Sequence, residues 1–290
     1  MENNKKDTNR HLNKIFDAKL SEKDFLRLQT FIQGNYGIKM PPEKQIMLQS
    51  RLQKRLRHLQ IPSYEEYLKY AFEKEPNVEL VHMMDVVSTN KTDFFREPAH
   101  FEFLSQRYLP EFYEAGGRHI DLWSAGCSSG EEVYTLAMVF EEFLRQNHGF
   151  DYHIFGTDIS TIVLKKAKQA VYTEKVAEII PPDMKRKYLL RSKNRDQQVV
   201  RLIPGIRKKT SYARLNFMDD DFSVHKKFDI IFCRNVLIYF NRETQEQVIN
   251  KLCRHLKVGG FFFFGHSESI TGLNVPLKYI QQTVFQKVNT

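Results

Sequence analysis

The sequence predicts a parallel, doubly wound α/β sheet preceded by a small helical domain. Its 290 residues suffice for two unequal domains. Apolar residues recur at helical spacing in the first part of the chain, and beyond it short apolar runs alternate with amphipathic helices. Such alternation is typical of an open parallel sheet with helices on its faces. We therefore expect a polar, disordered tail at residues 1–20, a helical domain at 21–85 and an α/β domain at 86–290.

The helical domain is expected to hold three helices. Ser21 can cap the first helix, and Gly34 and Gly37 are expected to end it. The second follows two prolines and runs to about His58; a stripe of leucines forms its apolar side and leaves its exposed side strongly positive. Ser63 and Glu66 form a capping box that begins the third helix.

The α/β domain contains four apolar stretches that predict strands of the main sheet. They are residues 119–126, 152–158, 228–233 and the FFFFG stretch that follows a turn at Gly259 and Gly260. One segment breaks the alternation, because residues 181–214 are rich in Lys and Arg and contain a short strand-like stretch before a turn. We expect this segment to be a small β insertion whose end returns to the main sheet.

Composition excludes several classes of protein. No stretch approaches the about 20 apolar residues of a membrane span, and no apolar run follows the basic N-terminus, so we expect a cytoplasmic protein without a secretory signal. The three cysteines are too far apart for a disulfide framework or a Cys-x-x-Cys site, so we expect reduced thiols and no metal. The net charge of +9 indicates an anionic partner, which could be nucleic acid, a membrane surface or an acidic protein.

The turn after the first predicted strand is one candidate binding site. Ligands of open parallel sheets bind beyond the carboxyl ends of the strands. There, the small residues of 124–130 would let the backbone approach a ligand closely. Glu131 and Glu132 come next; they would repel a pyrophosphate but suit a ligand that carries positive charge. The alternative is a simple turn between strand and helix, with the glutamates favouring the N-terminus of the helix.

Asp158, at the end of the second predicted strand, is the other candidate. A carboxylate at this point can accept hydrogen bonds from the two hydroxyls of a ribose, while an aspartate before a helix is also a common cap. Together with the small-residue turn, Asp158 favours a nucleoside ligand. A nucleoside with a cationic end and no phosphates fits S-adenosylmethionine better than NAD or ATP.

Five segments together resemble the CheR-type chemotaxis receptor methyltransferases. They occur in the family's order, as STNKTDFFRE, WSAGCSSGEEVYTLA, GTDIS, FDIIFCRNVLIYF and GGFFFFGHSE, and the resemblance extends over nearly the whole chain. It implies a Rossmann-like class I methyltransferase sheet with a small N-terminal helical domain and a small β insertion. It also implies an enzyme of sensory adaptation, which transfers the methyl group of S-adenosylmethionine to glutamate side chains of chemotaxis receptors and releases S-adenosylhomocysteine.

The resemblance implies roles for individual residues. Arg96 and Tyr239 are expected to be catalytic and to orient the acceptor carboxylate and the methionyl end of the cofactor. The residues expected to bind the cofactor are Asn90, Thr92, Arg96, Glu132, Asp158, Asn216, Phe217, Cys233, Arg234 and Asn235. A glutamate carboxylate, with an ordinary pKa of about 4.3, is already ionised at neutral pH, so no strong base is needed. The enzyme must align the reacting atoms and remove water. We assign no catalytic role to His266 and Ser267, because methyl transfer needs no covalent intermediate on the enzyme.

Several of these residues also have a purely structural interpretation. Asn90 and Thr92 could cap a helix, and Arg96 could be an ordinary surface charge. Cys233 could be a core residue at a strand end. Tyr239 could pack its ring and bond its hydroxyl to nearby backbone.

The basic side of the second helix suits the acidic helical bundles of receptor methylation regions. The residues expected to dock there are Lys44, Arg51, Lys54, Arg55 and His58. The alternative is a solvated basic face. In some relatives the β insertion also binds a receptor's C-terminal pentapeptide as an added strand, but their glycine-rich loop is missing at residues 192–197, so the sequence does not predict this tether.

Two other functions compete with this interpretation. One is a methyltransferase that acts on nucleic acid, which a basic chain could bind through phosphates. Against it, Asn235 is not followed by the Pro-Pro-Tyr common in base-amine methyltransferases. The other is a receptor-array binding protein of the same fold without catalytic activity. The sequence favours a monomeric enzyme with cytoplasmic receptor helices as partner, and neither nucleic acid binding nor membrane insertion.

Overall fold

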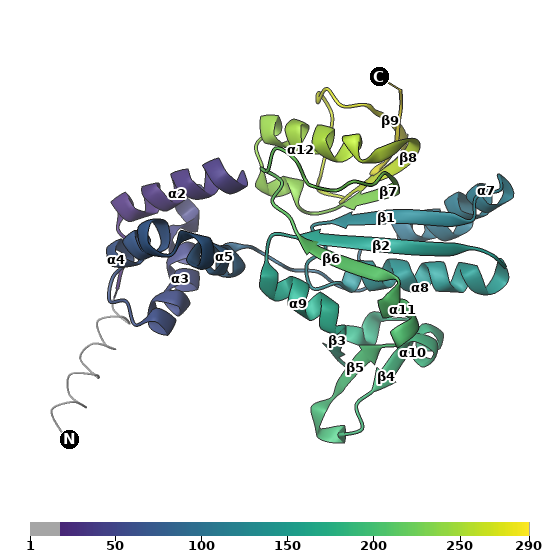
Figure 1. The fold of residues 1–290 in the computed structure, drawn as a ribbon, viewed down its shortest axis with the longest axis horizontal. Helices are drawn as coiled ribbons and strands as arrows, with labels where there is room; N and C mark the ends of the chain where they lie inside the picture. Colours follow the sequence, from purple (N-terminus) through teal and green to yellow (C-terminus); the bar gives the residue numbers. More distant parts are fainter. Residues whose placement is uncertain (1–17, 290) are drawn as a thin grey trace. The chain divides into compact units, whose positions relative to one another are not determined.

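The computed structural model describes residues 18–289, and these divide into two compact units with the boundary between Thr89 and Asn90 (Figure 1). Of the tail predicted at residues 1–20, residues 1–17 lie outside the described part. Between residues 18 and 289, no helix is both long enough and apolar enough to cross a membrane. The three cysteines are unpaired and buried.

The first unit is helical. The caps that the sequence predicts are present, since the hydroxyl oxygens of Ser21 and Ser63 accept the backbone N–H of Asp24 and Glu66, respectively. Its helices are α2 (Glu22–Tyr36), α3 (Gln45–Leu59), α4 (Tyr64–Lys69) and α5 (Pro76–Val87), with a 3-10 turn at Pro42–Lys44 and a π turn at Tyr70–Lys74. The sequence interpretation missed α5, whose apolar residues do not form a single stripe.

The second unit is built on a seven-stranded sheet. The strand order is β6-β2-β1-β7-β8-β10-β9. The first five strands of this order are parallel (Figure 1), and β10 is antiparallel to both β8 and β9. The strands are β1 (His119–Ala125), β2 (Asp151–Asp158), β6 (Thr210–Arg214), β7 (Phe228–Cys233), β8 (Leu256–Phe264), β9 (Leu277–Gln281) and β10 (Val284–Lys287).

The far end of the sheet differs from the sequence prediction. Gly259 and Gly260 do not form a turn before the strand; they lie inside β8, where Gly259 adopts a φ of 79°. The pairing of β7 with β8 is irregular at this point, which is typical of a bulge at a glycine in a strand. The antiparallel hairpin of β9 and β10 was not predicted either.

Helices lie in the connections between the strands and cover the sheet. They are α6 (Ala99–Phe103), α7 (Leu109–Glu114), α8 (Glu131–Gln146), α9 (Thr161–Gln169), α10 (Pro182–Tyr188), α11 (Pro204–Lys208) and α12 (Arg242–Arg254), with a π turn at Leu104–Tyr108 and 3-10 turns at Val176–Ile179, Arg195–Gln197 and Leu237–Tyr239. Ser160 and Asn241 cap α9 and α12. The helices between residues 99 and 114 were missed.

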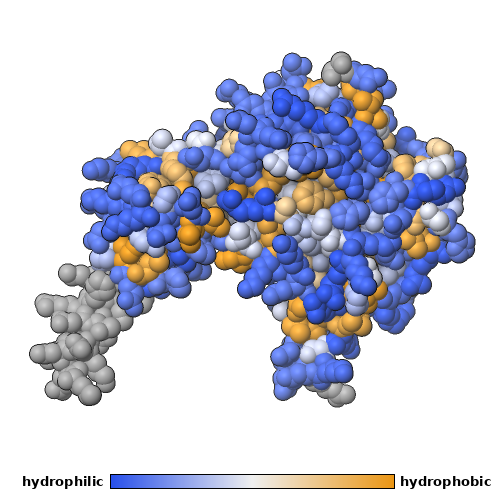
Figure 2. All heavy atoms as spheres, viewed as in Figure 1, coloured by the Kyte–Doolittle hydropathy of each residue, from blue (hydrophilic) through white to orange (hydrophobic). Residues whose placement is uncertain are grey.

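A second sheet of three short antiparallel strands lies between β2 and β6 in the chain. Its strands are β3 (Val171–Thr173), β4 (Leu189–Arg191) and β5 (Val199–Leu202), in the order β3-β5-β4. The small sheet starts before residue 181, because β3 supplies one of its edges. Figure 2 shows apolar surface in this region, where Val171 and Leu190 are exposed. The fold class predicted from the sequence, an α/β sheet with a helical N-terminal part and a β insertion, is confirmed.

Candidate functional site

The candidate site lies at the carboxyl ends of β1, β2 and β7. The strand order reverses at β1, which has β2 on one side and β7 on the other, and both neighbours are parallel to it. In open parallel sheets this reversal opens the crevice in which ligands bind. The loops after these three strands, together with residues 90–97, carry most of the cofactor residues that the sequence predicts.

The turn after β1 is held close to the loop after β7. Gly126 has a φ of 89°, and a Cβ atom at this position would lie 2.4 Å from Cγ2 of Val236, so only glycine fits. Two residues on, Ser128 has a φ of 48°; its N–H donates to Oδ2 of Asp158 at 2.9 Å and its hydroxyl to the carbonyl of Asn90 at 2.9 Å. This turn therefore joins three of the segments that form the site.

Asp158 is oriented by backbone donors. Its Oδ2 accepts the N–H of Ser128 and its Oδ1 accepts the N–H of Ser160, each at 2.9 Å. The cap of α9 is Ser160, whose hydroxyl oxygen accepts the N–H of Val163, and not Asp158. A carboxylate oxygen can accept more than one hydrogen bond, so a carboxylate oriented in this way is also suited to accept ribose hydroxyls.

The two glutamates at the start of α8 are bound by donors of the chain itself. The hydroxyl of Ser129 donates to both oxygens of Glu131, and burial raises the pKa of this carboxyl. Oε1 of Glu132 accepts the hydroxyl of Ser124 at 2.7 Å, and Oε2 accepts Nε of Arg234 at 2.7 Å. Because a guanidinium already balances the charge of Glu132, the electrostatic attraction to a cationic ligand that the sequence suggested is weaker than expected.

Arg234 is the centre of a buried network. Besides its bond to Glu132, it donates from Nη1 to the carbonyl of Arg96 at 2.9 Å and to Nδ1 of His100 at 2.8 Å. Burial lowers the pKa of His100 to about 3, and the positive charge of Arg234 is the second largest cause, so the imidazole ring is neutral. Its proton then lies on Nε2, which faces Oγ1 of Thr283 at 2.6 Å. The network fixes Arg234, and sequence reasoning missed His100, which no motif singled out.

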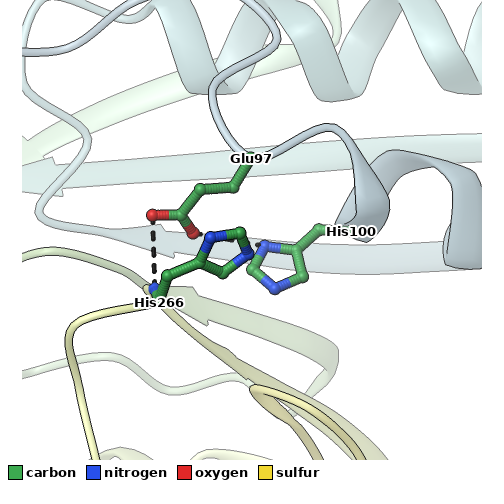
Figure 3. A group of neighbouring side chains, drawn as sticks. All are labelled: Glu97, His100 and His266. Carbon is green, nitrogen blue, oxygen red and sulfur yellow. Dashed lines mark hydrogen bonds and ion pairs between the residues drawn. The ribbon is translucent and has the colours of Figure 1, made fainter.

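Glu97, His100 and His266 form a group in which each residue offers a metal-ligand atom, and these atoms lie within 4.8 Å of one another (Figure 3). Arg234 donates to Nδ1 of His100, and its Nη1 lies 3.4 Å from Oε2 of Glu97. A metal ion bound here would face that guanidinium at close range. We therefore interpret the group as a hydrogen-bonded support, in which Glu97 also accepts the N–H of His266 at 3.3 Å (Figure 3).

Unusual backbone conformations gather in these loops. Phe95, Glu97, Ser128 and Asn235 all have φ between 48° and 59°. Left-handed conformations cost free energy in residues with a side chain and persist where the surroundings enforce them, often at functional sites. The segment around Arg96 is thus held in a defined shape, with Phe95 N–H donating to Oγ1 of Thr135 at 3.1 Å.

A surface hollow of about 750 Å³ lies beside Arg96. One wall is the segment from Asp93 to Pro98, and the other contains Val176 and Ile179 with their neighbours. Arg96 is half-buried, and its Nη1 donates to the carbonyl of Lys91 at 3.1 Å. The guanidinium is therefore placed at an open surface that a macromolecule can reach.

The remaining predicted cofactor residues differ in exposure. Phe217 packs edge-on against Phe240, and Asn216 accepts the N–H of Met218 in the turn after β6. Asn90, Thr92 and Asn235 lie in loops at the site and are half-buried, as is the predicted catalytic residue Tyr239. Cys233 has no exposed surface, and burial raises the pKa of its thiol well above the ordinary value. The structure thus supports the alternative interpretation of Cys233 as a core residue at a strand end.

The residues predicted to dock a receptor are of two kinds. Lys54 and His58 are exposed on α3, and Arg57, which the sequence prediction omitted, is exposed beside them. Arg55 forms a bidentate pair with Glu79 (2.9 and 2.6 Å), whose side chain is 2% exposed. Arg55 is therefore a structural residue, which corrects the prediction that it docks a partner.

Arg51 and Lys44 also interact within the first unit. Arg51 donates to the carbonyl of Val87, the last residue of α5, and to the carbonyl of Ser88 and Oγ1 of Thr89 just beyond it. Lys44 donates to the carbonyl of Lys39 at 3.0 Å, and burial lowers its pKa. Of the five predicted docking residues, Lys54 and His58 are the most available to a partner.

Replacing Glu79 with alanine should destabilise the helical unit by about 3 kcal/mol, because it leaves the charge of Arg55 partly buried without its partner. The free energy of unfolding from urea titration measures the effect. The matched control is Glu65→Ala, which removes the exposed pair with Lys69 and should change little. If Glu79→Ala lowers the free energy of unfolding no more than Glu65→Ala does, the ion pair of Arg55 with Glu79 has no structural role.

Comparisons with known proteins agree with this architecture. The family model "CheR methyltransferase, SAM binding domain" matches residues 90–286, and "CheR methyltransferase, all-alpha domain" matches residues 23–88. A chemotaxis protein methyltransferase of Borreliella burgdorferi is 37% identical over 273 residues, which are 92% of this chain and 95% of that protein. Those of Salmonella typhimurium (31%) and Escherichia coli (32%) also align with 92% of this chain, and with 90% and 91% of their own lengths, respectively.

Proposed function

The chain belongs to the CheR methyltransferase family, and from this premise we propose that it methylates glutamate side chains in the cytoplasmic helices of chemotaxis receptors. It is an S-adenosylmethionine-dependent enzyme of chemotaxis. The geometry that best supports the proposed site is the carboxylate of Asp158, oriented by Ser128 and Ser160 at the carboxyl end of β2.

The residues present fit an adenosyl cofactor. Asp158 supplies acceptors suited to ribose hydroxyls, and the turn at residues 126–130 is made of small residues and brings no basic side chain for a phosphate. Phe217 offers an apolar face for the adenine. When bound, S-adenosylmethionine supplies a methyl group that its positively charged sulfur already activates.

The chain's own part in the reaction is to position and to desolvate. The acceptor carboxylate is ionised at neutral pH and acts as the nucleophile without a strong base. Arg96, beside the open hollow, and Tyr239 hold this carboxylate in line with the methyl group. The contact with Arg96 must not be too strong, because a nucleophile stabilised in the ground state attacks more slowly.

The exposed cations of α3 are the proposed docking surface for the acidic receptor helices. Charge reversal by Lys54→Glu together with Arg57→Glu should raise KM for receptor on the order of fivefold, because the proposed ion pairs of these two side chains with acidic receptor residues are lost. The maximal rate and the affinity for S-adenosylhomocysteine should not change. Steady-state methylation of receptor-containing membranes measures the effect at low and high salt, since screening should reduce the difference.

Lys69→Glu is the control for this pair, because Lys69 is also exposed in the helical unit but lies on α4. An equal change in KM for the control and the double variant would point to a general charge effect and contradict a docking surface on α3.

The acceptor class is tested with labelled S-adenosylmethionine. The enzyme is incubated separately with receptor-containing membranes, with nucleic acid and alone. We expect label only in the receptor. Label in nucleic acid would favour the competing methyltransferase function, and no transfer in any mixture would favour a catalytically inert binding protein. The proposal also includes a monomeric enzyme with a cytoplasmic site of action.

A further inference from the structure

Glu268 binds an unusual number of backbone donors. Its Oε1 accepts the N–H groups of Val236 (2.9 Å) and Leu237 (2.8 Å), and its Oε2 accepts those of Asn235 (3.0 Å) and Gly265 (2.6 Å). Burial raises the pKa of Glu268, while these four donors act in the opposite direction. A half-buried carboxylate with four backbone donors is held in a fixed position.

Three of these donors are consecutive in the loop after β7. Asn235 has a left-handed φ of 59° and Val236 is right-handed helical, a succession that turns neighbouring N–H groups toward one point. Such a concavity binds an anion, and here Glu268, which follows β8, supplies it from within the chain. The left-handed conformation of Asn235 costs free energy, as it does for any residue with a side chain. The carboxylate of Glu268 therefore stabilises this conformation of the loop.

The end of β8 is shaped to receive this loop. A Cβ atom on Gly265 would lie 2.5 Å from Nδ2 and 2.9 Å from the backbone nitrogen of Asn235. Glu97 also contributes, because its Oε1 accepts Nδ2 of Asn235 at 3.2 Å. Glycine at 265 thus permits the close approach that the bonds to Glu268 require.

The loop leads directly to Tyr239. The 3-10 turn Leu237–Tyr239 begins at the last of the three consecutive donors, and Tyr239 N–H donates to the carbonyl of Val236 at 3.2 Å. The position of the Tyr239 side chain therefore depends on a turn whose start is bound by Glu268.

We propose that Glu268 is the positioning residue for Tyr239 in methyl transfer. It binds the backbone of the loop after β7, and Tyr239 carries the effect to the reacting groups. The inference rests on the catalytic role of Tyr239 proposed above.

Glu268→Gln tests this inference with little change in volume. Glutamine keeps one acceptor oxygen but turns an NH₂ group toward two backbone donors. We expect kcat with receptor to fall about tenfold. The affinity for S-adenosylhomocysteine should fall less than kcat does, because Asn235 is the one predicted cofactor residue that Glu268 binds and Asp158 lies on another loop. The matched control is Glu246→Gln, which changes a half-buried carboxylate that accepts one backbone N–H, that of Asn274, and should keep full activity.

A double-mutant cycle with Tyr239→Phe separates positioning from general stabilisation. If Glu268 acts through Tyr239, Glu268→Gln should cost less than about twofold in kcat once Tyr239 is phenylalanine. A purely structural role would lower the unfolding temperature and leave kcat per folded molecule unchanged, which would overturn the inference.

A second variant displaces the loop without altering the carboxylate. Gly265→Ala should press on Asn235 and reproduce the loss of kcat, again without further loss in the Tyr239→Phe background. If Tyr239→Phe lowers kcat while Glu268→Gln does not, or if the two losses multiply, the inference fails and the proposed function stands. Full turnover by Tyr239→Phe would instead overturn the role of Tyr239, and the inference with it.

Discussion

Replacing Asp158 with alanine is expected to weaken the binding of S-adenosylhomocysteine about a hundredfold. Hydrogen bonds to a charged acceptor contribute about 1.5–3 kcal/mol each, and a loss of about 3 kcal/mol corresponds to roughly a hundredfold in affinity. The variant also leaves the N–H groups of Ser128 and Ser160 without the carboxylate that orients them. Calorimetric titration of the full chain measures the change directly.

Two further variants make this test specific. Asp158→Asn keeps one acceptor oxygen and should lose less affinity than Asp158→Ala. Asp220→Ala, at an exposed position after β6, should bind like the wild type. If Asp158→Ala remains folded and binds within about threefold of the wild-type value, Asp158 is not the ribose ligand, and the cofactor must bind elsewhere.

Tyr239→Phe is expected to lower kcat for receptor methylation roughly thirtyfold, through loss of one hydrogen bond that aligns the acceptor. Because the hydroxyl is proposed to act on the reacting groups, the affinity for S-adenosylhomocysteine should change little. An effect confined to kcat indicates an interaction that matters in the transition state. Steady-state rates at saturating cofactor and receptor give the measurement.

Tyr279→Phe is the matched control, since Tyr279 is an exposed tyrosine on the edge strand β9. It should keep the wild-type rate. A wild-type rate for Tyr239→Phe as well would remove Tyr239 from the mechanism, and an equal rise in KM and the dissociation constant of the cofactor would make it a binding residue instead.

Much of the fold follows from local sequence signals. Ser21 and Ser63 cap the helices they were expected to cap, because a short polar side chain before an amphipathic stretch satisfies free backbone donors. Strand β7 was predicted with its observed bounds, since it is apolar at nearly every position and buried on both faces. The hairpin of β9 and β10 was missed because β9 is partly exposed at the sheet edge and has no clear alternation.

The site could be predicted as a list of residues but not as a network. Motifs pointed to Glu132 and Arg234 separately, and no sequence spacing indicated that they pair with each other across 102 positions. Arg55 was expected on an exposed face, because helical periodicity gives the direction of a side chain but not the presence of Glu79 opposite it. Such pairings depend on how distant elements pack.

The chemistry of the product tests the central claim most directly. Receptor labelled by this enzyme from S-adenosylmethionine is isolated and exposed to mild base. Because a glutamyl methyl ester hydrolyses under these conditions, we expect the label to be released as volatile methanol. Label that stays on the receptor protein after base treatment would show methylation of another group and contradict the transfer of the methyl group to a carboxylate.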